Sequence, residues 1–202
     1  MKGRPRKFDL DKALENAMLV FWRNGYEGSS LSELTAAMEI NRPSLYGTFG
    51  DKKQLFFRAL DRYVADYGSK GIAQLPKYPD ITDAIAAFFN CIVEQLTNSQ
   101  LPNGCLIANC TLECGDRFRQ IDRRLNQYHA ETEAALYNRL QQAQAKGQIS
   151  ETDDVRALAQ FFTTTMLGMA VMARTNPDPI VIRQLAKTAM RILPNNLGRV
   201  IN

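Results

Sequence analysis

Three of the four cysteines, Cys105, Cys110 and Cys114, lie within the stretch NGCLIANCTLECG at residues 103–115. Cysteines this close together can bind a metal, form a disulfide, react with electrophiles or oxidants, or fill space in a helix as small apolar side chains. A tetrahedral zinc site needs four ligands, and His129 could be the fourth, but no Cys-x2-Cys pair is present. We therefore expect neither a metal nor a cofactor.

The three cysteines differ in what their positions allow. Cys110 and Cys114 are four residues apart, so on a helix they share one face. Cys105 follows Gly104 at an expected helix start, where the helix dipole lowers the pKa of a thiol. Small apolar packing and a sensing thiol both remain open, and Cys105 is the one with a physical reason to react.

Composition predicts a soluble globular protein that can bury a core. The chain has 202 residues, 45% of them apolar, and a net charge of +4. No apolar run reaches the roughly 18 residues of a membrane span, and the basic start MKGRPRKFDL has no apolar stretch behind it. We expect a cytoplasmic protein with no membrane partner. A structural disulfide is disfavoured in the cytoplasm, where thiols are kept reduced.

Charge is unevenly distributed along the chain. Residues 1–63 hold 11 Lys/Arg and 8 Asp/Glu, whereas residues 64–202 hold 14 and 13. A small basic N-terminal part on a nearly neutral body suggests a polyanionic partner for that part, although a solubilising tail has the same composition.

Almost every segment has helical periodicity, so the predicted fold class is all-α. Asp9, Asn41 and Asp51 can each cap a helix, and Ser30 with Glu33 forms a capping box. Expected helices end at Gly25 and near residues 38, 49 and 67, followed by a Gly/Pro-rich linker at 68–80. Further helices are expected over 81–96, from about 105, over 116–145, over 155–175 and over 180–193.

The stretch SSLSELTAAMEINRPSLYGTFGDKKQLF has the helix-turn-helix layout, two short helices joined by a tight turn. Leu45 and Phe49 can anchor the second helix to a core, while polar groups in its N-terminal half can reach base edges and phosphates. Lys52 and Lys53 follow at the start of the next helix, where free backbone N–H groups and the dipole favour a phosphate. A small helical domain with a merely hydrated polar face is the alternative.

Residues 9 to about 63 resemble the N-terminal domain of the TetR/AcrR family of transcriptional regulators, through NGY, the Ser-capped second helix, SLYGTF and DKKQLF in order. The resemblance implies a dimeric repressor with a three-helix DNA-binding domain and a larger helical ligand-binding domain. It implies an arm at 1–8, a DNA-binding domain at 9–50 and a ligand-binding and dimerisation domain at 51–202. The residues expected to contact DNA are Arg4, Arg6, Lys7, Ser30, Arg42, Pro43, Ser44, Tyr46, Thr48, Lys52 and Lys53.

Two short stretches carry narrower expectations. Position 43 is often Gly in the family, so Pro43 is expected to alter base preference. GRPRK is typical of arms that place arginines in a narrow A·T minor groove, or it is a tail adding only nonspecific affinity. GCLIAN resembles a stretch in TetR-like regulators, some of which respond to electrophiles or oxidants through cysteine.

The body is expected to hold a ligand pocket, because apolar walls with a few polar groups are typical of small-ligand sites. An ordinary core has the same composition, and His129 is either an inducer contact or a satisfied side chain. The predicted wall comprises Phe88, Phe89, Ile92, Cys105, Tyr128, His129, Thr132, Phe162, Thr165, Met166 and Met169.

The last two helices are apolar on more than one face, which a two-fold four-helix bundle between two copies would bury. The predicted dimer residues are Val155, Leu158, Leu167, Val171, Ile182, Leu185 and Ala189. The predicted function is therefore a ligand-responsive repressor that binds a palindromic DNA operator as a homodimer. A cysteine-based redox-responsive repressor and a protein-binding helical adaptor are the alternatives, and no catalytic motif indicates an enzyme.

Overall fold

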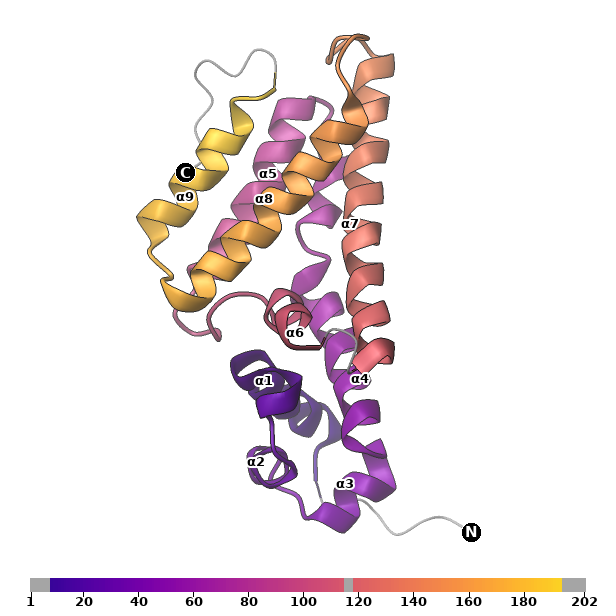
Figure 1. Ribbon diagram of the computed structural model, residues 1–202, viewed down its shortest axis with the longest axis vertical. Helices are drawn as coiled ribbons and strands as arrows, with labels where there is room; N and C mark the ends of the chain where they lie inside the picture. The colour runs from indigo at the N-terminus through magenta and orange to yellow at the C-terminus, as the bar shows by residue number, and fades with distance from the viewer. Residues whose placement is uncertain (1–7, 115–117, 194–202) are drawn as a thin grey trace.

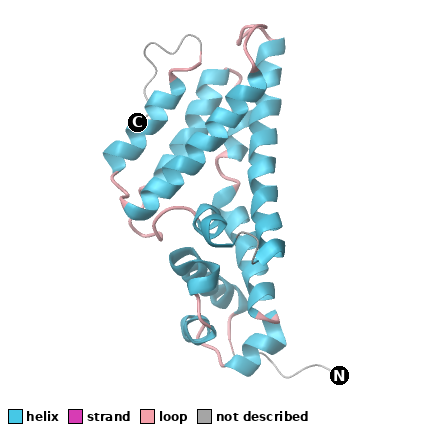
Figure 2. Cartoon of the chain, in the orientation of Figure 1, coloured by secondary structure: helices cyan, strands magenta, loops and turns pink. Residues whose placement is uncertain are grey.

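The computed structural model describes residues 8–114 and 118–193, and these are folded into helices joined by short loops (Figures 1 and 2). The predicted all-α class is confirmed. The α-helices are α1 (Leu10–Gly28), α2 (Leu31–Ala37), α3 (Arg42–Phe49), α4 (Lys52–Tyr63), α5 (Ile81–Leu96), α6 (Leu106–Cys114), α7 (Arg119–Ala145), α8 (Val155–Thr175) and α9 (Pro179–Met190). A π-helix, η1 (Val64–Gly68), and a 3-10 helix, η2 (Ile72–Lys77), join α4 to α5.

Side-chain caps explain where the first helices begin. The Asp9 carboxylate accepts from two backbone N–H groups of α1, and the Asn41 side chain accepts from the Ser44 N–H at 2.9 Å. α2 starts with the predicted capping box, in which the Ser30 hydroxyl accepts from Glu33 N–H at 3.1 Å and the Glu33 carboxylate accepts from Ser30 N–H at 2.9 Å. These bonds satisfy N–H groups that have no partner inside a helix.

α1 continues beyond Gly25, where the sequence predicted its end. The helix is kinked there, because Gly25 has φ 73° and ψ −179°, a conformation that other residues avoid. The Glu113 carboxylate of α6 lies against the same glycine, within 2.0 Å of where a Cβ would stand. Gly25 therefore allows both the kink and the close approach of α6.

Buried side chains form two clusters, one at each end of the molecule. The lower core joins α1–α4 to α6 and the first half of α7, and its large members include Trp22, Phe56 and Tyr63. The upper core joins α5 and η2 to α8, α9 and the second half of α7, and it includes Phe88 and Phe162. α6 lies between the two ends, and α7 runs along both (Figure 1).

The segment between α4 and α5 differs from the predicted linker at 68–80. α4 ends at Tyr63 and continues as the π-helix η1, and the 3-10 helix η2 packs Leu75 into the upper core. Arg139 of α7 donates to the carbonyl oxygens of Leu75, Tyr78 and Pro79 at 2.9–3.1 Å. These bonds hold the connection against the bundle, so it has a fixed course.

Among the described residues, α8 is long and apolar enough to cross a membrane by length and composition alone. Its inner face, including Phe162 and Met169, is buried in the upper core. A core helix of a soluble bundle passes the same test, so α8 is weak support for a membrane span.

Candidate DNA-binding surface and ligand cavity

α2 and α3 form the predicted helix-turn-helix at one end of the molecule (Figure 1). Leu45 and Phe49 are buried and fix α3 to the lower core, whereas the Tyr46 side chain is 51% exposed on the opposite side. Pro43 lies in the first turn of α3, where its missing N–H costs no helical hydrogen bond. The helix is therefore anchored on one face and free on the other.

The polar residues predicted for DNA contact lie in or beside this free face. Arg42 and Pro43 are exposed, and Ser44 and Thr48 are partly exposed. The Arg42 guanidinium donates to the Ser32 hydroxyl of α2 at 2.8 Å, which holds it at the start of α3. Ser30 is exposed, but its oxygen already accepts the Glu33 N–H of the capping box.

Lys52 and Lys53 are partly exposed at the start of α4. The Lys52 ammonium lies 4.6 Å from the centre of the Tyr26 ring and donates to the Glu27 carbonyl at 3.4 Å. Burial beside that ring lowers the pKa of Lys52 from its usual value, while Glu27, Glu113 and Glu33 oppose the shift. This lysine is therefore held in place before any phosphate arrives.

Arg58 of α4 was missed by the sequence analysis. It donates to the Thr48 carbonyl at 3.2 Å and lies over the Phe49 ring, so it stands at the end of α3. This cation lies two residues beyond the DKKQLF motif, and no local pattern marks it. Arg4, Arg6 and Lys7 of the predicted arm lie outside the described residues.

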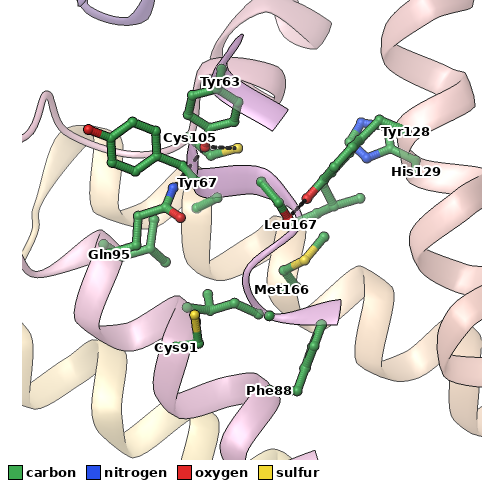
Figure 3. A pocket seen from close by; sticks show the side chains of 15 residues that line it. Tyr63, Tyr67, Phe88, Cys91, Gln95, Cys105, Tyr128, His129, Met166 and Leu167 are labelled. Atoms are coloured by element: carbon green, nitrogen blue, oxygen red, sulfur yellow. Dashed lines mark hydrogen bonds between the residues drawn. The ribbon is translucent and has the colours of Figure 1, made fainter. Parts of the chain in front are cut away.

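A cavity of about 40 Å³ lies between the two cores (Figure 3). η1 supplies Tyr67 and Gly68 to its wall, and α4, α5, α7 and α8 complete the enclosure together with Gly71 and with Cys105, the residue before α6. Its lining residues are Tyr63, Tyr67, Gly68, Gly71, Phe88, Cys91, Ile92, Gln95, Leu96, Cys105, Tyr128, His129, Met166, Leu167 and Ala170. The enclosure is mainly aromatic and aliphatic, with hydroxyl, amide, imidazole and thiol groups among them.

Six of the predicted wall residues line this cavity: Phe88, Ile92, Cys105, Tyr128, His129 and Met166. The other five lie outside it, and their assignment is corrected here. Phe89 and Phe162 pack on each other in the upper core, with ring centroids 5.7 Å apart, and Met169 is buried in the same core. Thr132 is buried one turn beyond Tyr128 and donates to its carbonyl, and Thr165 lies on a partly exposed face of α8.

Tyr63, Tyr67, Cys91 and Gln95 line the cavity but were not predicted. The two tyrosines are at the end of α4 and in η1, within the helix that the sequence predicts to end near residue 67. Their rings contact Trp22 of α1, with centroid separations of 4.8 Å for Tyr63 and 5.2 Å for Tyr67. The π-helical geometry that turns Tyr67 toward the cavity has no sequence pattern that would have revealed it.

A hydrogen-bonded chain links Cys105 to α4 and α5. Gln95 Nε2 donates to the Tyr63 hydroxyl at 2.8 Å, and that hydroxyl donates to Cys105 Sγ at 3.1 Å. Backbone N–H groups of Ile107 and Ala108 also favour the Cys105 thiolate, as the helix-start argument anticipated, but burial outweighs them and raises the pKa of the thiol. The expectation of a lowered pKa is therefore wrong.

The remaining cysteines lend no support to a metal or disulfide. Cys91, Cys105 and Cys110 do not form disulfides, and Cys110 is fully buried in the lower core. Within the described parts of the chain, no group of three His, Cys, Asp or Glu side chains could hold a metal ion. The side chain of Cys114 lies outside the described residues.

The predicted dimer residues divide into two groups. Val155, Leu158, Ile182 and Ala189 are buried inside the single chain, so their side chains cannot form a surface for a partner. Val171 is exposed, Leu185 is partly exposed, and Leu167 lines the cavity from α8. On α8 and α9 the sequence pattern did not distinguish the apolar residues that pack inside the chain from those that remain exposed.

Two family models match the chain, one over each part. Residues 13–59 match the description "Bacterial regulatory proteins, tetR family", and residues 82–189 match "Tetracyclin repressor-like, C-terminal domain". The second match alone covers more than half of the chain. This chain belongs to the TetR family.

TetR-family relatives extend over almost the whole chain. The HTH-type transcriptional repressor ComR of Escherichia coli K12 is 37% identical over 96% of this chain and 92% of its own length. The repressor BdcR of the same organism is 30% identical over 93% of this chain and 88% of its own length.

A solved structure of similar shape is the TetR family regulator CifR, a cysteine mutant complexed with a 26-base-pair double-strand operator DNA. It is 33% identical with a TM-score of 0.90, and the match covers 95% of this chain and 100% of that one. This TetR-family chain is therefore a DNA-binding transcriptional regulator, with a helix-turn-helix at one end and a helical domain for ligand binding and dimerisation.

Proposed function

We propose that this regulator is a cytoplasmic repressor whose operator affinity falls when a small molecule enters the cavity between its two cores. The observation that carries this proposal is that Tyr63 and Tyr67 line the cavity and also pack on Trp22 of α1. α1 is the central helix of the DNA-binding end and is fully buried at Trp22. A ligand that moves the tyrosines therefore acts directly on the DNA-binding part.

The size of the cavity makes such movement necessary. A volume of about 40 Å³ holds only a few water molecules, because each needs roughly 10–15 Å³ of such space. Because protein cores are close-packed, a larger guest has to push the wall outward. Residues of α4 and η1 form one side of that wall, so the end of α4 is displaced relative to α1.

Displacement of α4 changes the DNA-binding end because α4 begins at Lys52, beside α3. Two copies must place their α3 helices about one DNA turn apart, roughly 34 Å, to read a palindrome. A ligand that is bound more tightly by the displaced state shifts the population away from that spacing. The difference between the ligand's affinities for the two states is the only free energy that drives this shift.

The dimer is expected to use the outer faces of α8 and α9. Phe161, Val171 and Met172 of α8 and Ile180 of α9 are exposed, with Ile180 at 77%. Gly168, also exposed on α8, has nothing within 4 Å of where a Cβ would stand, so a partner helix can approach closely there. Pairing of α8 and α9 with their two-fold mates would cover these side chains.

Duplex-DNA binding as a function of salt concentration tests the regulator function. Binding is expected to weaken steeply with salt, since each neutralised phosphate contributes about 0.9 to the slope of log K against log salt. Arg42→Ala and Lys52→Ala should each weaken binding and reduce that slope by about 1. Lys146→Ala, an exposed cation at the far end of α7, is the matched control and should leave the slope unchanged.

Removal of residues 1–7 tests the proposed groove-tracking arm in the same assay. The truncated protein is expected to bind more weakly and with a flatter salt dependence, because Arg4, Arg6 and Lys7 no longer meet phosphates. A salt slope equal to that of the full chain would refute the arm. If the full chain showed no salt-sensitive binding to duplex DNA, the regulator function itself would be refuted.

The hydrogen bond from Tyr63 to Cys105 favours a second candidate, in which an electrophile or oxidant modifies Cys105. A group added to Sγ would occupy the cavity and break the link to Tyr63, with the same mechanical result as a bound ligand. Release of DNA by an electrophile should then persist after dialysis and disappear in Cys105→Ser. Persistence of that release in Cys105→Ser would exclude this cysteine as the sensor.

A further inference from the structure

The protonation state of His129 can be deduced from its neighbours. The Thr111 hydroxyl donates its single hydrogen to the Ile107 carbonyl at 2.8 Å, and the same oxygen lies 3.3 Å from His129 Nε2. Because that hydroxyl hydrogen is already used, Thr111 can only accept from the ring, so Nε2 carries the hydrogen. Burial lowers the pKa of His129 and keeps the ring neutral at pH 7.

The other ring nitrogen, Nδ1, is therefore a hydrogen-bond acceptor. It is buried and has no partner among the described residues. His129 belongs to the cavity wall, where its ring stands beside Tyr128 (Figure 3). A buried acceptor without a donor is costly, so a bound molecule that donates to Nδ1 would remove that cost.

Other polar groups in the wall have also committed their hydrogens. The Tyr63 hydroxyl donates to Cys105 Sγ, and the Tyr128 hydroxyl donates to the Gly68 carbonyl at 2.5 Å. The Tyr63 oxygen also accepts from Gln95 Nε2, and each of the two oxygens keeps a lone pair that can accept a further hydrogen bond. Gln95 retains one N–H, and the Tyr67 side chain is also part of the wall.

No Asp, Glu, Lys or Arg side chain is part of this wall as the structure describes it. A carboxylate or phosphate placed there would lose its hydration without meeting a cation, which is strongly unfavourable. A neutral molecule with an O–H or N–H group would meet the lone pair of His129 Nδ1 and bury its apolar part against the aromatic rings.

We propose that the cavity selects an uncharged ligand with a hydrogen-bond donor, of the phenol or alcohol class, and that His129 Nδ1 is the acceptor that recognises it. This inference rests on the cavity being the ligand site proposed above. It goes further because it names the ligand chemistry and one specificity-determining atom.

Calorimetric titration of the full chain with phenol, anisole and benzoate tests the proposal. Phenol donates a hydrogen bond, anisole has the same ring without a donor, and benzoate adds a negative charge. Phenol is expected to bind about tenfold more tightly than anisole, the value of one additional hydrogen bond to a buried acceptor. Benzoate is expected to give no saturable heat.

Variants of His129 assign the preference to one atom. His129→Phe keeps a ring but removes the acceptor, and the phenol-to-anisole ratio should fall to about one. His129→Asn places an amide near the Nδ1 position and should recover part of the preference, which also guards against misfolding of the first variant. Tyr137→Phe, two turns further along α7 and outside the cavity wall, is the control that should leave the ratio unchanged.

Three results would overturn the proposal: equal affinities of the wild type for phenol and anisole, binding of benzoate as tight as that of phenol, or a tenfold preference that survives in His129→Phe. Absence of saturable heat with all three compounds would also overturn it. The regulator function is tested separately, by the salt dependence of duplex-DNA binding. None of these calorimetric results changes that measurement, so failure of the ligand assignment can be distinguished from failure of the regulator function.

Discussion

Gly25→Ala is expected to destabilise the protein by about 1–4 kcal/mol. Gly25 has φ 73° and ψ −179°, and holding a residue with a Cβ in that region costs about 1–3 kcal/mol. The new Cβ would also stand 2.0 Å from the Glu113 carboxylate, which must then move. Moving it disrupts the 3.4 Å ion pair with Arg174, a partly exposed contact worth up to about 1 kcal/mol.

The assay is urea unfolding monitored through the fluorescence of Trp22, the one tryptophan in the sequence, at fixed protein concentration. In thermal unfolding the same loss corresponds to a fall in Tm of about 2–16 °C, at about 2–4 °C per kcal/mol for a chain of this size. Gly28→Ala is the matched control, because its Cβ would meet only the Asn24 Cβ at 3.6 Å. That variant should be neutral or more stable by up to about 1 kcal/mol.

A double variant separates strain from collision. In a Glu113→Ala background the added Cβ at residue 25 has no carboxylate to displace, so Gly25→Ala should cost only the backbone strain of about 1–3 kcal/mol. If the substitution costs the same in both backgrounds, the collision with Glu113 contributes nothing. If Gly25→Ala is as harmless as Gly28→Ala, the whole reasoning about the kink is refuted.

Two further substitutions or titrations probe the DNA-binding and ligand ends. Gly47→Ala on the exposed part of α3 meets nothing within 4 Å, so it should raise stability by about 0.5–1 kcal/mol in urea unfolding. The same variant should weaken DNA binding in a titration, if α3 enters the groove; unchanged affinity would place Gly47 away from DNA. Alkylation of Cys105 by iodoacetamide should be slower in the folded than in the unfolded protein and still accelerating at pH 9, since burial raises the pKa of this thiol and the thiolate is the nucleophile. A rate that levels off below pH 8 would contradict that direction.

Local chemistry explains why the helix starts were predictable and the cavity was only partly so. Ser30, Asn41 and Asp51 cap helices through bonds to the residue three positions away, which sequence spacing reveals directly. Thr132 was wrongly assigned to the wall because, although it shares a face of α7 with Tyr128, it lies one turn further along the helix and is buried outside the cavity lining. Spacing predicts which residues share a face but not which neighbour that face meets.

The predicted dimer residues show the same limit of sequence periodicity. A helix apolar on several faces predicts more than one contact, but periodicity alone cannot say which face is covered within the chain. The structure covers Ile182 and Ala189 with α5 and α8 and leaves Ile180 exposed. Only the packing of the whole bundle distinguishes these positions, and their spacing along the chain does not.

The free energy needed to shift the population between the two states sets a lower limit on the size of the ligand. Reversing a population from 99:1 to 1:99 requires about 5.5 kcal/mol of preference for one state. A single hydrogen bond to His129 that gives tenfold affinity supplies about 1.4 kcal/mol of it. The remaining 4 kcal/mol or so corresponds to about 160 Å² of apolar surface buried in one state and not in the other, at about 25 cal/mol per Å².

That area is comparable to one aromatic side chain, which buries about 150–250 Å². A molecule the size of a single ring is thus near the lower limit for full release, and it far exceeds the present cavity of about 40 Å³. The same enlargement that accommodates the ring must separate Tyr63 and Tyr67 from their neighbours. Both tyrosines pack on Trp22 of α1. The displacement of Tyr63 and Tyr67 that exposes apolar surface to the ligand is therefore the same displacement that acts on α1.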